Sequence, residues 1–115
     1  MSEQLDQEAL VRILVEPKNA LIKQFRKLFE LDGVDLEFTE DAIQAISEVA
    51  LKRGIGARGL RSILEEILLN VMYHVPSDEQ VAQVIVNAAV VNDGASPQML
   101  TRAQLVRNDR RERSA

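Results

Sequence analysis

The sequence predicts an α+β fold, mainly helical, with a small two- to three-stranded sheet. Its 115 residues suffice for one domain with a modest core. Two short stretches, 34–38 and 81–86, have the character of strands. Helical spacing of apolar residues marks four segments, which span residues 5–14, 17–31, 40–53 and 57–74.

The first two helices are separated by Glu16-Pro17. A residue before proline is pushed out of the α region, whereas Pro17 suits the first position of the next helix. Gly33 is placed to end that second helix. The alternating stretch 34–38 then indicates a half-buried strand.

Thr39 is a credible N-cap for the helix 40–53, and Gly54 suits its end. The next helix, 57–74, carries the strongest periodic signal. Its apolar stripe consists of Leu60, Ile63, Leu64, Ile67, Leu68, Val71 and Met72. After it we expect the strand 81–86, a brief helical turn from Asn87 to Val91, and a short edge strand over 97–101.

The charge divides the chain into an acidic body and a basic tail. Residues 102–115 carry five arginines against two acids, a net charge of +3, which leaves −7 on residues 1–101 of the total −4. Without sustained apolar periodicity, the tail is expected to be disordered. It is either a solubilising terminus or a contact for nucleic acid or an acidic partner. We therefore expect a hinge and leading helix over 1–15, one domain over 16–101, and the disordered tail over 102–115.

The composition excludes several classes of function. There is no cysteine and only one histidine, so no thiolate or zinc site is expected. There is no apolar run long enough to span a membrane and no secretory signal at the start, which fits a cytoplasmic protein. The acidic body argues against nucleic-acid binding by the folded part.

The stretch RGIGARGLRSI, residues 53–63, contains the pattern G-x-G-x-x-G. A dinucleotide-binding turn needs a strand before its first glycine, and here a helix precedes it. A Walker A loop is absent from the sequence. We therefore expect no catalytic residue here and no nucleotide hydrolysis by this chain alone.

This stretch nevertheless breaks local rules. Arg58 and Arg61 lie in the first turns of a helix, where each cation costs about 0.3–1 kcal/mol. Gly59 inside the helix costs about 1 kcal/mol relative to alanine. Such violations are typical of functional sites, and a helix start beside guanidinium groups can bind an anion. Gly56 and Gly59 would let a ligand or another backbone come close.

A purely structural interpretation stays open. Arg61 and Glu65 are spaced to form an i, i+4 ion pair, and the glycines could serve only the tight turn. On a helical wheel Arg58 lies about 140° from the middle of the apolar stripe, so it should point away from the core. Arg61 lies on the flank of the stripe and is the more structural of the two.

Two stretches carry a resemblance to a known family: GARGLRSILEEILLNVMYHVPS and ILVEPKNALIKQFRKLFELDGVDLEF. They resemble the C-terminal small domain of the Clp/Hsp100 AAA+ unfoldases, in the ClpX/HslU branch. The similarity runs from about residue 5 to 91. GARGLR favours ClpX, because the HslU-like form has a second arginine in place of Gly59. The basic tail lies outside the resemblance.

The resemblance implies a lid, or sensor-2, domain of an ATP-driven hexameric unfoldase and chaperone that feeds a ClpP-type peptidase. Arg58 would be the sensor-2 arginine that reaches the nucleotide phosphates, with Arg61, Gly56 and Gly59 beside it. The implied hinge falls on Leu5 and Asp6. Ile13 and Leu14 would border the adenine.

The resemblance also implies cofactors and partners. ATP or ADP with Mg²⁺ would be bound by the full-length protein, and none is expected on the isolated domain. The partners would be the large AAA+ domain of the same chain and of the neighbouring subunit, with peptidase and protein substrates engaged by regions other than this domain. No nucleic acid, membrane or metal site is expected. The alternatives are an HslU-type small domain or a protein-interaction module without a nucleotide role.

Overall fold

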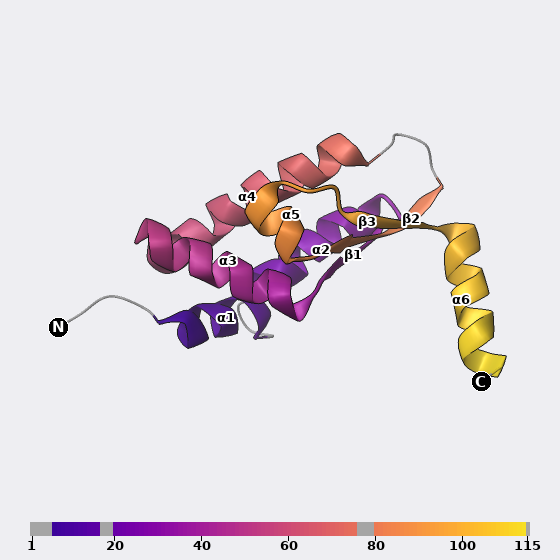
Figure 1. Ribbon diagram of the computed structural model, residues 1–115, viewed down its shortest axis with the longest axis horizontal. Helices are drawn as coiled ribbons and strands as arrows, with labels where there is room; N and C mark the ends of the chain where they lie inside the picture. The colour runs from indigo at the N-terminus through magenta and orange to yellow at the C-terminus, as the bar shows by residue number, and fades with distance from the viewer. Residues whose placement is uncertain (1–5, 17–19, 76–79, 115) are drawn as a thin grey trace.

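The computed structural model describes residues 6–16, 20–75 and 80–114, without the side chains of 111–114. Most of the helices pack together beside a small sheet, and one helix stands apart at its end (Figure 1). The elements are α1 Gln7–Val15, α2 Leu21–Leu31, β1 Asp35–Phe38, α3 Glu40–Arg53, α4 Gly56–His74, β2 Val81–Val86, α5 Ala88–Asp93, β3 Gln98–Thr101 and α6 Arg102–Ser114. The predicted α+β class is confirmed.

The predicted ends of the helices follow their capping residues. Asp6 caps α1 by accepting a hydrogen bond from the Ala9 N–H at 2.8 Å. Thr39 caps α3 in the same way through Ala42, at 3.3 Å. The helix predicted over 40–53 is confirmed at both ends. The second helix begins at Leu21 among the described residues, and the predicted start at Pro17 lies outside them.

The sheet has three strands in the order β1-β2-β3. β1 and β2 are parallel, with Leu36 opposite Val84, and they are connected through α3 and α4. β3 runs antiparallel to β2, with Met99 opposite Val84. The stretches 34–38 and 81–86, predicted as strands, are therefore neighbours in the sheet, and the expected edge strand is β3.

The core forms where the stripe of α4 meets α1, α3 and the sheet. Six of the seven predicted stripe residues are buried, namely Leu60, Ile63, Leu64, Ile67, Leu68 and Val71. The prediction was wrong for Met72, which is 62% exposed. Met72 lies about 100° of helix rotation beyond Val71, at the margin of the stripe. Burial of each large apolar side chain contributes roughly 1.5–3 kcal/mol, so this stripe is a large contribution to the stability.

The tail expected to be disordered is the helix α6 instead. Thr101 and Gln104 form a capping box: the Gln104 N–H donates to Thr101 Oγ1 at 3.2 Å, and the Thr101 N–H donates to Gln104 Oε1 at 2.8 Å. Arg102 Nη2 also donates to the Gly33 carbonyl at 3.4 Å. The helix thus begins on reciprocal hydrogen bonds rather than on an apolar stripe. α6 projects from the end of the sheet (Figure 1).

Replacing Thr101 with alanine should loosen α6, because one half of the capping box is lost. We expect a local destabilisation of about 1 kcal/mol. Amide hydrogen exchange over residues 104–110 measures it, with Thr101→Ser as the control that keeps the hydroxyl. Equal exchange in Thr101→Ala and the unmodified chain would contradict the capping role.

Candidate functional site

The turn between α3 and α4 consists of only Gly54 and Ile55. Gly54 has φ +65°, and its N–H donates to Leu51 O at 3.1 Å, while the Ile55 N–H donates to Ala50 O at 3.3 Å. These two bonds are a Schellman motif, which satisfies the last carbonyls of α3. Gly56 then begins α4 with φ +61°, a conformation that costs other residues roughly 1–2 kcal/mol. The glycines are therefore required by the backbone of the turn.

Gly59 makes room for a side chain of its own chain. A Cβ on Gly59 would overlap the Cδ1 and Cγ1 atoms of Ile55. The expectation that Gly59 leaves space for a ligand or another backbone is therefore corrected: Ile55 fills that space. No pattern in the sequence indicated this contact, because it depends on the direction in which the turn enters α4.

Arg58 lies in the first turn of α4 with its side chain exposed. Neither a hydrogen bond nor an ion pair holds it within residues 6–16, 20–75 and 80–114. The N-cap residue Ile55 has no side-chain acceptor, so no described side chain caps the start of α4. The guanidinium and the first N–H groups of α4 thus share one exposed helix end, which is suited to an anion.

Arg61 is bound to α2. Its Nη2 donates to Gln24 Oε1 at 2.5 Å, and its guanidinium carbon lies 5.4 Å from the centre of the Phe25 ring. Such a cation–π contact stabilises an exposed arginine by about 0.5–1 kcal/mol. Arg61 contacts α2 rather than pairing with Glu65, which was the structural alternative.

The residues proposed for the hinge and the adenine border lie on or before α1. Leu5 lies outside the described residues, and Asp6 is the exposed N-cap of α1. Ile13 is half-buried and keeps accessible surface. Leu14 has no exposed surface, because it packs within the hydrophobic core, so only Ile13 of this pair can touch a ligand directly.

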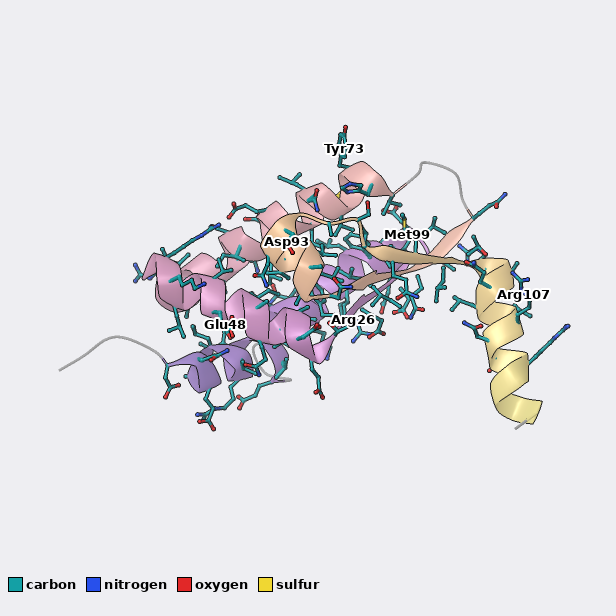
Figure 2. The ribbon with its side chains drawn as sticks, in the orientation of Figure 1. Arg26, Glu48, Tyr73, Asp93, Met99 and Arg107 are labelled. Atoms are coloured by element: carbon teal, nitrogen blue, oxygen red, sulfur yellow. The ribbon has the colours of Figure 1, made fainter. Side chains whose placement is uncertain are left out.

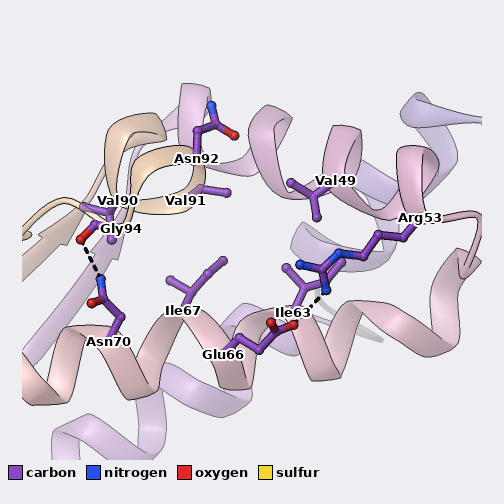
Figure 3. Close-up of a pocket in the computed structure, with 10 residues that line it drawn as sticks. All are labelled: Val49, Arg53, Ile63, Glu66, Ile67, Asn70, Val90, Val91, Asn92 and Gly94. Atoms are coloured by element: carbon purple, nitrogen blue, oxygen red, sulfur yellow. Dashed lines mark hydrogen bonds and ion pairs between the residues drawn. The ribbon is translucent and has the colours of Figure 1, made fainter.

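A groove of about 270 Å³ lies between α3, α4 and α5 (Figure 3). Its floor is apolar, with Ile63 and Ile67 among the lining residues. The Arg53–Glu66 ion pair, 2.8 Å long, lies at one side, and Asn70 donates to the Gly94 carbonyl at the other. Sequence reasoning missed this groove, because it depends on how α5 packs against two helices distant in sequence.

An exposed apolar face was also missed. Leu69, Met72 and Tyr73 are 69%, 62% and 85% exposed on the outer side of α4. Figure 2 shows Tyr73 pointing away from the rest of the domain. The i, i+4 spacing of Leu69 and Tyr73, off the predicted stripe, is the sequence signal that could have found this face, whereas Met72 was assigned to the stripe. We call Leu69, Met72 and Tyr73 the outer face of α4.

The described part of the chain contains no candidate for a metal site or for a membrane-spanning helix. No group of three or more metal-ligating side chains is found among residues 6–16, 20–75 and 80–114. Nor does any described helix have the length and apolarity needed to cross a bilayer.

The fold and the α3–α4 turn define a small domain of the AAA+ type, and comparison with known families agrees. Residues 5–90 match the model of the C-terminal, D2-small domain of ClpB protein. The chain belongs to this family of C-terminal small domains.

Similar proteins place the chain in the ClpX branch. It is 50% identical over 102 residues to "ATP-dependent Clp protease ATP-binding subunit ClpX 3" of Methylococcus capsulatus, covering 89% of this chain. It is 46% identical over 100 residues to the ClpX subunits of Borrelia duttonii and Borrelia recurrentis, covering 86% of this chain. The chain spans 23% of the length of each of these relatives. The resemblance to a ClpX small domain is confirmed, and these relatives favour it over the HslU-type alternative.

The two arginines should differ in their effect on stability. Arg61→Ala removes a hydrogen bond and the cation–π contact, so we expect a loss of about 1 kcal/mol in the free energy of unfolding. Arg58→Ala should change it by less than about 0.5 kcal/mol, because that exposed side chain makes no hydrogen bond or ion pair with a described residue. Urea unfolding of this chain measures both values, and a larger loss for Arg58→Ala would contradict the assignment.

Proposed function

We propose that this chain is the lid domain of an ATP-dependent unfoldase subunit, and that Arg58 contacts the phosphates of a nucleotide bound on a large AAA+ domain. The carrying observation is the exposed Arg58 at the uncapped start of α4, unpaired among the described residues. A guanidinium binds phosphate through charge-assisted hydrogen bonds, and the first N–H groups of α4 favour the same charge. The relatives' names, which describe an ATP-binding subunit, support this interpretation.

The two arginines of α4 have different roles in this proposal. Arg61 fixes α4 to α2 through Gln24 and Phe25, and so serves the phosphate site by holding the helix. Gly56 adopts the positive φ that the turn requires at this position. Arg58 remains available for a ligand supplied from outside the domain.

The cofactor of the complete protein would be ATP or ADP with Mg²⁺. Its metal and most of its phosphate contacts belong to the large domain, so the isolated small domain is expected to bind nucleotide weakly or not at all. Of the two residues expected to border the adenine, Ile13 on α1 keeps accessible surface and would make this contact.

Hydrolysis would be coupled to motion through the same contact. Loss of the γ-phosphate removes part of the charge-assisted interaction with Arg58. The small domain then rotates as a rigid body about the hinge at Leu5 and Asp6. Its rigidity follows from the continuous core that joins α1, α3, α4 and the sheet.

The outer face of α4 would transmit that rotation to the next subunit of a hexameric ring. Exposed Leu69, Met72 and Tyr73 form an apolar surface, of the kind that marks a protein interface. Its partner in this proposal is the large domain of the neighbouring subunit. A ClpP-type peptidase and protein substrates would be engaged by other regions of the complete protein, in the cytoplasm.

A protein-interaction module without a nucleotide role is the second candidate. The exposed outer face of α4 favours it. The two functions differ in the group that would bind the Arg58 guanidinium. In an interaction module that group would be a facing carboxylate, and in a lid it would be a phosphate. The absence of a carboxylate paired with Arg58 in the described residues supports the lid.

Arg58→Ala in the complete subunit should lower ATP hydrolysis and protein unfolding by about tenfold or more, because a charge-assisted phosphate contact is lost. The rate of phosphate release and the unfolding of a tagged fluorescent substrate measure this. Lys23→Ala, an exposed cation on α2, is the control. An Arg58→Ala subunit with unchanged ATPase activity would reject the proposal.

Tyr73→Ala combined with Leu69→Ala should weaken ring assembly, since two large apolar side chains leave the outer face. We expect a loss of about 2 kcal/mol, or about thirtyfold in the subunit dissociation constant. Light scattering over a concentration series measures it. Val106→Ala, an apolar residue 52% exposed on α6, is the matched control, and equal assembly in both variants would exclude the outer face from the interface.

A further inference from the structure

Ile55 occupies a junction that serves both helices. Its N–H closes the last turn of α3 by donating to Ala50 O, and the same residue is the N-cap of α4. Its side chain lies over the bare backbone at Gly59, one turn further along α4. Ile55 therefore links the end of α3 to the first turn of α4, although its side chain contributes no polar group to either.

The fit of Ile55 against Gly59 leaves no room for a side chain. A Cβ on Gly59 would overlap Cδ1 and Cγ1 of Ile55 and would lie 2.7 Å from its Cβ. The Ile55 Cβ is fixed to the backbone, so a new rotamer of Ile55 cannot relieve the overlap. Either the backbone of the turn or the first turn of α4 must move.

We propose that Ile55 and Gly59 are positioning residues: their contact sets the direction of the first turn of α4 and thereby aims Arg58 at the nucleotide. This inference rests on the proposed function of Arg58. We call the contact the Ile55–Gly59 wedge.

The dependence of Arg58 on the wedge follows from its lack of other contacts. No described residue holds its guanidinium by a hydrogen bond or an ion pair. Its starting direction therefore comes from the backbone at residues 57–59. That backbone is fixed from one side by the buried Leu60 and from the other by the wedge.

The wedge also explains a glycine that helix propensity disfavours. Gly59 has ordinary helical geometry, unlike Gly54 and Gly56, so its φ gives no reason for glycine. An alanine there would favour the helix intrinsically. The presence of glycine is accounted for by the space that Ile55 occupies.

The first test measures geometry in this chain. Gly59→Ala should shift the backbone amide resonances of residues 54–61 and the Arg58 side-chain Nε–H resonance, while the rest of the spectrum stays unchanged. Ile55→Val, which removes one methyl and keeps the branched Cβ, should cause small shifts. Ser62→Ala is the matched control, an exposed position on the same helix. A spectrum of Gly59→Ala as little changed as that of Ser62→Ala would overturn the wedge.

The second test separates positioning from general damage in the complete subunit. Gly59→Ala should lower ATP hydrolysis about tenfold, since a small misplacement of a binding group is costly. It should have no further effect in an Arg58→Ala background, because its effect acts through that guanidinium. If Gly59→Ala fails to fold, Ile55→Gly is used, which removes the wedge without adding an overlap.

The outcomes distinguish the two proposals. Normal ATPase activity in Gly59→Ala together with a loss in Arg58→Ala overturns the wedge and leaves the function of Arg58 standing. A further loss of about tenfold when Gly59→Ala is added to Arg58→Ala also overturns it. Normal activity in Arg58→Ala overturns the proposed function itself.

Discussion

The apolar stripe of α4 is the constraint on which the rest of the molecule depends. Its buried side chains join α1, α3 and the sheet in one continuous cluster. Each contributes roughly 1.5–3 kcal/mol, whereas an arginine at the start of the helix or a glycine within it costs about 1 kcal/mol or less. The stripe can therefore hold α4 in place while its first turn carries residues that helix propensity disfavours. In the proposed function, this helix, with an exposed guanidinium at one end and an apolar outer face, would transmit a rigid-body rotation.

The two arginines show how tertiary packing assigns roles to similar residues. Arg58 and Arg61 are three residues apart and both violate the preference for acids at a helix start. Arg61 lies over Phe25 and bonds Gln24, both from α2, so its charge is used within the domain. Arg58 has no such neighbour among the described residues and stays available. The helical wheel predicted the outward direction of Arg58, but the partner of Arg61 depends on where α2 packs.

Much of the fold could be predicted because its signals are local. Thr39 and Gly54 predicted both ends of α3, and the periodicity of α4 predicted six buried residues. The capping box at Thr101 and Gln104 is also a local signal, but the prediction of disorder rested on the lack of apolar periodicity and did not use it. Met72 was misplaced because a periodic pattern does not say how wide a strip of the helix the neighbouring elements cover.

The sequence by itself determined the class of fold, both ends of α3, the apolar stripe of α4 and the membership in the family of small domains. Caps, periods and motifs act over a few residues, and so they can be read along the chain. Only the tertiary structure decided that Ile55 fills the space over Gly59, that Leu14 is enclosed, and that a groove opens beside Asn70. The first depends on the direction in which the α3–α4 turn enters α4, and the other two depend on distances between atoms of separate elements, which are set when the core packs.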